Sequence, residues 1–300
     1  MNGISRRQVL AGAAAIVAGA AFARAADVVK PAAEPTGGPK FQLGLVTYNV
    51  AKDWDVPTIL KVCRAAGIAA VELRTTHKHG VEPTLNKDQR AEVRKRFADS
   101  GVRLWGLGSV CEFHAADRAV VDKNIETCKQ FVDLAADLGA AGVKVRPNGF
   151  PKGVPQEKTL EQIGKALVPC GDAAAAKGLE IWVEVHGPGT QEPAACEQIM
   201  KHCGHKAVGL TWNSNPTDVK DGSVADSFAK LKPWVRSCHI NDLKNDAAKK
   251  YPYRELFKLF REAGYDRYTM CEVGTAYPDP EKGEAFLKEY KALWTTLANG

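Results

Sequence analysis

A single rhythm repeats along the chain from Phe41 onward, and it restricts the fold more than any other feature. A short apolar run is followed by polar residues, then by an amphipathic stretch, and then by a glycine. Eight such runs occur, and successive runs begin 27 to 39 residues apart. Each interval is long enough for a strand, a crossover helix and two loops. The runs are Gln42–Tyr48, Ala70–Arg74, Arg103–Leu107, Gly142–Arg146, Leu179–Val185, Val208–Trp212, Val235–Ile240 and Arg267–Val273.

The stretches between these runs are predicted to be helices that end at glycines. Asn86–Ser100 and Tyr253–Ala263 carry apolar residues three or four positions apart, and Gly101 and Gly264 follow as left-handed caps. Eight βα units without a long insertion predict one (β/α)8 TIM barrel domain over residues 41–300. An open doubly wound sheet is the alternative. Such a sheet usually has fewer strands, and no phosphate-binding glycine motif follows the first run.

The first 25 residues are interpreted as an export signal outside the fold. Ser5-Arg6-Arg7-Gln8-Val9-Leu10 has the twin-arginine pattern, an alanine-rich stretch follows, and Ala23-Arg24-Ala25 suits signal peptidase. The stretch is too short for a membrane span. We therefore expect export to the periplasm or the medium through the twin-arginine pathway, with no stable membrane anchor; a short retained anchor is the alternative. Residues 26–40, rich in Ala, Pro and Gly, are predicted to be a linker.

Net charge and cysteine placement bear on nucleic-acid binding and on disulfide formation. The formal net charge is +6, and cleavage would remove Arg6, Arg7 and Arg24 and no acid, leaving 6 − 3 = +3. A charge of this size does not predict nucleic acid as a partner. None of the eight cysteines belongs to a C-x-x-C motif, so we expect most to be buried thiols, with a pair close in space left open. The sequence does not decide between a monomer and a homo-oligomer.

Chemically capable side chains gather where the runs end, which is the active-site face of a barrel. Five of the seven histidines follow or end a run: His77, His79, His114, His186 and His239. Side chains alternate across a strand, and apolar neighbours occupy the opposite parity. Glu184, His239 and Glu272 are therefore predicted to point into the barrel mouth.

Asn213, which directly follows the run Val208–Trp212, completes a set of four polar residues. Two carboxylates, one imidazole and one amide oxygen suit Mn2+ or Mg2+, with Co2+ or Zn2+ as alternatives. Any one of these residues alone would be explained as a buried, hydrogen-bonded polar group. Four of them on four successive strands predict a divalent metal site formed by Glu184, Asn213, His239 and Glu272.

Over residues 41–297 the chain resembles the xylose isomerase-like TIM barrels, a superfamily of sugar isomerases and epimerases. The matching motifs are Val71-Glu72-Leu73-Arg74, Glu184-Val185-His186, His239-Ile240-Asn241-Asp242 and Cys271-Glu272-Val273-Gly274. The resemblance implies that Glu184, His239 and Glu272 are metal ligands and that position 213 is the fourth. The common pattern there is Trp-Asp-Pro, whereas this chain has Trp212-Asn213-Ser214. The change removes one negative charge, so the metal would bind less tightly and be a stronger Lewis acid.

The resemblance implies a metal-dependent sugar isomerase or epimerase with a small-molecule carbohydrate substrate. Glu184 and Glu272 would move a proton at the carbon next to a carbonyl, through an enediolate. A second hypothesis is a lyase or hydratase on keto-sugars or 3-keto-glycosides; export favours it, and the extra histidines offer an acid for a leaving group. A third is a non-catalytic carbohydrate-binding protein. A DNA-repair nuclease of the same superfamily is disfavoured, because such enzymes carry more metal ligands.

Further residues near the ends of the runs are predicted to bind substrate. They are His77, His79, Glu112, His114, Lys144, Arg146, His186, Asp242 and Lys244, with Trp212 stacking on the sugar. For Lys144 and Arg146 the alternative is a salt bridge to a barrel carboxylate such as Glu72. Asp242 is expected either to orient His239 or to touch substrate.

Overall fold

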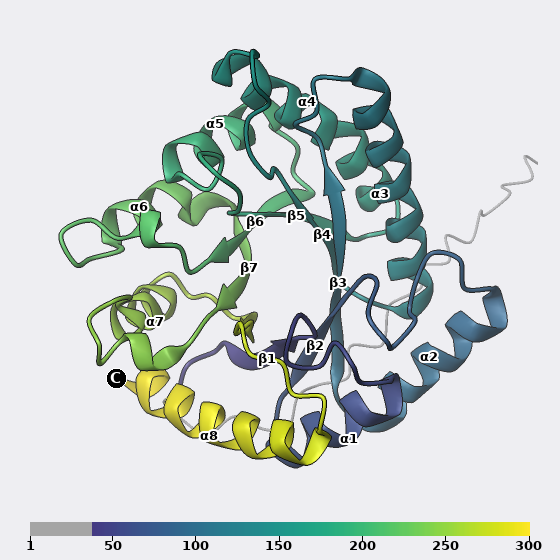
Figure 1. The fold of residues 1–300 in the computed structure, drawn as a ribbon, viewed down its shortest axis with the longest axis vertical. Helices are drawn as coiled ribbons and strands as arrows, with labels where there is room; N and C mark the ends of the chain where they lie inside the picture. Colours follow the sequence, from purple (N-terminus) through teal and green to yellow (C-terminus); the bar gives the residue numbers. More distant parts are fainter. Residues whose placement is uncertain (1–37) are drawn as a thin grey trace, which may run out of the picture. The chain divides into compact units, whose positions relative to one another are not determined.

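The computed structural model describes residues 38–300, which form a closed barrel of eight parallel strands surrounded by helices (Figure 1). The strands follow one another around the barrel in chain order, and β8 pairs with β1. This confirms the predicted (β/α)8 TIM barrel. The predicted export signal, residues 1–25, and most of the predicted linker, residues 26–40, lie outside the described residues. Within residues 38–300 no helix combines the length and apolar character that crossing a membrane requires.

The strands lie close to the predicted apolar runs. The main difference is β3, which continues past the predicted end at Leu107 and still pairs with β4 at Glu112↔Arg146. The strands are β1 Gln42–Val46, β2 Ala70–Arg74, β3 Arg103–Glu112, β4 Gly142–Arg146, β5 Glu180–Glu184, β6 Val208–Asn213, β7 Val235–Ile240 and β8 Tyr268–Cys271.

One helix follows each strand. The helices are α1 Val56–Ala66, α2 Lys87–Ser100, α3 Arg118–Leu138, α4 Gln156–Ala175, α5 Pro193–Cys203, α6 Ala225–Leu231, α7 Tyr253–Glu262 and α8 Pro280–Asn299. Short 3-10 turns lie at η1 Pro216–Asp218, η2 Lys232–Trp234 and η3 Leu243–Asn245.

Local sequence explains where the helices begin and end. Asn86 caps α2 through a capping box with Gln89, because each side chain accepts a hydrogen bond from the other residue's backbone N–H. Gly139 follows α3 with φ 76°, a left-handed conformation that favours glycine. The α3 helix begins at Arg118, where the Asp117 side chain accepts a hydrogen bond from the backbone N–H of Ala119.

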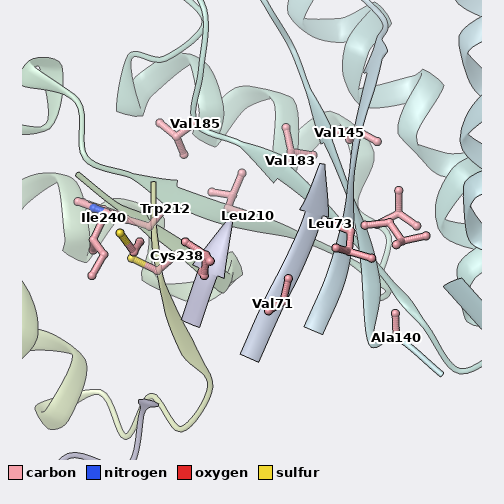
Figure 2. Packing of buried hydrophobic residues seen from close by; sticks show 14 of the residues in the cluster. Val71, Leu73, Ala140, Val145, Val183, Val185, Leu210, Trp212, Cys238 and Ile240 are labelled. Carbon is pink, nitrogen blue, oxygen red and sulfur yellow. The ribbon is translucent and has the colours of Figure 1, made fainter. Parts of the chain in front are cut away.

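The main apolar core lies between the barrel and the helices. Strand residues of one parity supply it, including Val71, Val183, Leu210, Cys238 and Ile240 (Figure 2). Because alternate residues of a strand face opposite sides of the sheet, this arrangement directs the residues between them into the barrel.

A smaller apolar layer fills the interior of the barrel. Trp105 and Trp182 stack there with ring centroids 4.8 Å apart, and Met270 packs with them. A Cβ atom at Gly142 would lie 2.8 Å from the Trp182 ring, so this glycine makes room for the indole. Trp182 precedes Glu184 by two residues, and Met270 precedes Glu272 by two. The layer therefore forms an apolar floor beneath the polar ends of the strands.

All eight cysteines are buried as free thiols, distributed between the barrel strands and the helices that pack on them.

Candidate active site

Four polar residues end neighbouring strands at one side of the barrel. Glu184 is the last residue of β5, Asn213 is the last residue of β6, and His239 lies in β7, directly opposite Asn213 in the register. Glu272 follows β8. In Figure 2 the flanking residues Val183, Val185, Cys238 and Ile240 lie in the outer core, so Glu184 and His239 face the barrel interior, as strand alternation predicts.

Three of these side chains converge on one point. One ligand atom from each of Glu184, His239 and Glu272 lies within 4.8 Å of the others. His239 Nδ1 is 3.5 Å from Glu184 Oε1 and 3.1 Å from Glu272 Oε2. The His239 ring is fully buried, and Nδ1 forms no hydrogen bond with any described residue. Nδ1 is therefore the nitrogen that faces the two carboxylates.

The other ring nitrogen of His239 faces a third carboxylate, Glu72, which the sequence named only as an alternative partner for Lys144 or Arg146. His239 Nε2 lies 3.1 Å from Glu72 Oε2, and both side chains are fully buried. A carboxylate that holds one imidazole nitrogen fixes the ring and leaves the other nitrogen free to bind a metal. Strand alternation contained the signal, because Val71 and Leu73 pack in the outer core and Glu72 must face inward.

Lys144 brings a positive charge into this group of carboxylates. Its Nζ lies 2.7 Å from Glu184 Oε2, and both side chains are 5% exposed. The predicted alternative of a salt bridge with a barrel carboxylate is thus realised, with Glu184 as the partner. Asn213 Nδ2 lies 3.3 Å from Glu184 Oε1, so both oxygens of Glu184 meet a donor.

These charges shift one another's titration. Burial disfavours the charged forms, but the Lys144 ammonium and His239 hold the pKa of Glu184 well below its usual range. Burial likewise opposes the Lys144 ammonium, but Glu184, Glu72 and Glu272 outweigh it and raise the pKa of Lys144. The carboxylates of Glu272 and Glu72 similarly raise the pKa of His239 well above its ordinary value, against the effect of burial.

The donor set fits a divalent cation. Two carboxylate oxygens and an imidazole nitrogen within 4.8 Å are the hard and borderline ligands that Mn2+, Mg2+ and Zn2+ accept. A buried Nδ1 that forms no well-oriented hydrogen bond and faces two carboxylates is the arrangement expected at a cation site. Asn213 is adjacent, and its amide can present either oxygen or nitrogen after a rotation of the side chain.

A second polar cluster lies at the ends of β3 and β4. Arg146 donates two hydrogen bonds to Glu112 Oε1, at 2.9 and 2.6 Å, and Asn148 Nδ2 donates to the same oxygen at 2.8 Å. His114 Nδ1 is 3.9 Å from Glu112 Oε2. The structure thus brings Glu112, His114 and Arg146 together, and it adds Asn148, which the sequence reasoning did not select.

The two histidines after β2 have different environments. His79 is buried, and both ring nitrogens contact the backbone, at Arg74 O (2.8 Å) and Val81 N (3.0 Å), which ties it to the loop rather than to a substrate. His77 lies 3.1 Å from Thr47 Oγ1 and stacks on the Tyr48 ring. Burial lowers the pKa of His77 to about 4, so its imidazole is neutral near pH 7.

Three other predicted residues form no hydrogen bond or ion pair with Glu184, His239 or Glu272: Trp212, Asp242 and Lys244. Trp212 packs in the outer core against Phe228 and donates to the Tyr251 hydroxyl at 2.9 Å, so it does not stack at the mouth as predicted. Asp242 and Lys244 are exposed, and the Asp242 side chain accepts from the Lys244 N–H. The orienting role expected of Asp242 belongs to Glu72.

His186 follows Glu184 by two residues on the mouth side of β5. Its ring is partly buried, and its Nδ1 has no hydrogen-bond partner among the described residues. The position beside Glu184 and the free nitrogen leave this imidazole available for a ligand.

Comparison with known proteins agrees with the barrel fold. The profile of the family described as xylose isomerase-like TIM barrel matches residues 60–290. The chain belongs to this family. A search of curated proteins finds no match.

Solved structures with the same fold include two sugar epimerases. The apo form of 3-keto-D-glucoside 4-epimerase, YcjR, from E. coli superposes with TM-score 0.70 at 12% identity, over 85% of this chain and 99% of that one. An L-ribulose 3-epimerase gives TM-score 0.70 at 16% identity, over 86% and 94%. The IOLI protein with a bound zinc atom gives 0.67 at 15%, over 86% and 98%. At such identities the likeness is one of fold.

Proposed function

We propose that this member of the xylose isomerase-like TIM barrel family is a metal-dependent sugar isomerase or epimerase. The observation that carries the proposal is the convergence of Glu184, His239 and Glu272 within 4.8 Å at the catalytic face of the barrel. The names of the two epimerases that share the fold support a carbohydrate substrate, and the zinc atom in a third relative supports a divalent cation.

In the proposed reaction a proton is moved at the carbon next to a carbonyl, and each side chain of the site has its own role. Glu184 and Glu272 are the two carboxylates of the converging group that would hold a cation, so they are the candidates to exchange a proton with that carbon. A bound Mn2+ or Mg2+, or alternatively Co2+ or Zn2+, would polarise the carbonyl and stabilise the charge on its oxygen. Glu72 holds the ring of His239 so that Nδ1 faces the ligand group. One of the two carboxylates would take the proton while the C–H electron pair forms the C=C bond of an enediolate. The charge on the enediolate oxygen would be stabilised until the proton returns to carbon.

A metal-dependent lyase on keto-sugars or 3-keto-glycosides is the second candidate. Elimination needs the same base and, in addition, an acid for the leaving group. The partly buried His186, with its unpartnered Nδ1 two residues after Glu184, favours this candidate.

Solvent-deuterium exchange separates these functions. The full chain would be loaded with Mn2+ and incubated in D2O with a panel of ketoses and 3-keto-glycosides, then analysed by NMR and mass spectrometry. Exchange without release of an aglycone supports the isomerase or epimerase, and release supports the lyase. Glu184→Gln should abolish either reaction, whereas the matched change at Glu161, a partly exposed residue of α4, should not. A loaded wild-type protein that exchanges no sugar of the panel would overturn the proposal.

A further inference from the structure

The two glutamates of the proposed site are not equivalent. Glu184 is held on both oxygens, by Lys144 Nζ at 2.7 Å on Oε2 and by Asn213 Nδ2 at 3.3 Å on Oε1. Among the described residues, the Glu272 carboxylate forms one ion pair, between its Oε2 and His239 Nδ1 at 3.1 Å. The Glu272 side chain is 14% exposed, whereas that of Glu184 is 5% exposed.

The Lys144–Glu184 pair restricts what Glu184 can do. A charge-assisted hydrogen bond of 2.7 Å between two buried groups is strong, and breaking it would leave the buried Lys144 ammonium without a hydrogen-bond partner among the described residues. Glu184 therefore cannot turn its Oε2 towards a substrate carbon at little cost. Its Oε1 faces the ligand atoms of His239 and Glu272.

Strand geometry fixes Lys144 in this role. It lies on β4 directly opposite Trp182 of β5, in the register Lys144↔Trp182, and the indole belongs to the apolar floor. Glu184 is the next inward-facing residue of β5. The ammonium therefore emerges from the neighbouring strand beside the carboxylate and has no access to bulk water, since Lys144 is 4% exposed.

We propose that Lys144 is a positioning residue that makes the two glutamates unequal: it holds Glu184 as a metal ligand only and leaves Glu272 as the single carboxylate that exchanges a proton with the substrate. This inference rests on the proposed function and narrows it. An epimerase that uses two carboxylate bases needs one on each face of the carbon, whereas in this site only Glu272 is free to act as a carboxylate base.

One acceptor suits an isomerisation. Glu272 takes the proton as the C–H electron pair forms the C=C bond of the enediolate and the carbonyl oxygen takes up the charge. The same proton then returns from Glu272 to the adjacent carbon, and a new carbonyl forms when the neighbouring hydroxyl gives up its proton to the first oxygen. Atoms and electrons balance without an oxidant or a second base.

The first test measures metal binding, which needs no substrate. Mn2+ would be titrated calorimetrically into the metal-free full chain for wild type, Lys144→Met and the surface control Lys165→Met, whose exposed ammonium pairs with Glu161. Removing the Lys144 ammonium frees Oε2 and removes a like charge, so affinity should rise at least tenfold. The control should match wild type. Unchanged or weaker binding by folded Lys144→Met would overturn the inference.

If Lys144→Met does not fold, Lys144→Gln replaces it, because the amide can still donate a hydrogen bond to Glu184 but carries no charge. The affinity of Lys144→Gln for Mn2+ should also rise. An unchanged affinity would count against the inference.

The second test measures on which face of the sugar carbon deuterium from the solvent is incorporated. For any ketose that wild type exchanges in D2O, deuterium should enter on one face, and Lys144→Met should add the epimeric product because Glu184 becomes free. Epimer formation by wild type at a rate equal to isomerisation would overturn the inference. If wild type exchanges no sugar, the proposed function fails, and the metal titration still decides the role of Lys144.

Discussion

The buried carboxyl group of Asp218 should make the free energy of unfolding depend on pH, and its surroundings determine by how much. Asp218 ends η1, just after β6, and is 1% exposed. Its Oδ2 accepts hydrogen bonds from the Asn215 N–H and the Tyr251 hydroxyl, both at 2.9 Å, and Oδ1 has no partner among the described residues. Burial raises the pKa of Asp218 from 3.8 to about 7, although both hydrogen bonds lower it.

The sign of the effect follows from proton linkage. Because the folded pKa is raised, the stabilisation from this proton is complete below the unfolded pKa of 3.8 and is lost as pH rises through about 7. Each unit of pH in that window changes the free energy of unfolding by about 1.4 kcal/mol. Between pH 5 and pH 8 wild type should therefore lose about 2–3 kcal/mol through this group, a loss that Asp218→Asn avoids.

Urea unfolding of wild type and Asp218→Asn at pH 5 and pH 8 tests this. The stability difference between the two proteins should move by about 2–3 kcal/mol in favour of the variant at pH 8. Comparing the two pH values cancels the pH-independent effect of placing an amide in the site. Asp226→Asn, at a side chain 76% exposed, is the control and should show no such change. A difference between wild type and Asp218→Asn that stays constant with pH would refute the reasoning.

Glu72→Gln should weaken Mn2+ binding by about 10- to 100-fold, because a carboxylate that orients the ligand histidine is replaced by an amide; calorimetry checks this, with Glu161→Gln as the control, and equal affinities would contradict it. We propose that residues 1–25 direct twin-arginine export, so changing Arg6 and Arg7 to Lys should retain the protein in the cytoplasm; cell fractionation checks this, and unchanged export would count against it. Trp182→Ala should destabilise the protein by about 3–5 kcal/mol, because it empties the apolar floor; a loss under 1 kcal/mol in urea unfolding would show that the floor is not tightly packed.

Much of the fold follows from the sequence because strand periodicity and helix capping are local properties. Alternation places Val183 and Val185 outside the barrel and therefore Glu184 inside it, and the same rule selects His239. The end of β3 was missed because Gly106 and Gly108 weaken the strand signal, although Gly108 lies in the sheet where a Cβ atom would come within 2.8 Å of Glu72 Oε1.

The pairings within the site could not be read from the sequence. Lys144 and Glu184 are 40 residues apart, and Glu72 and His239 are 167 apart, so their meeting depends on the register of the closed barrel. Trp212 was misplaced although alternation held the answer, since an inward Asn213 requires its neighbour to face the helices.

Anomalous diffraction from crystals soaked in Mn2+ tests the central claim most directly. We predict one strong anomalous peak at the carboxyl ends of β5, β7 and β8, from an ion bound by Glu184 Oε1, His239 Nδ1 and Glu272 Oε2. A peak at another position, or none at Mn2+ concentrations that saturate calorimetric binding, would contradict the assignment of these residues as a metal centre.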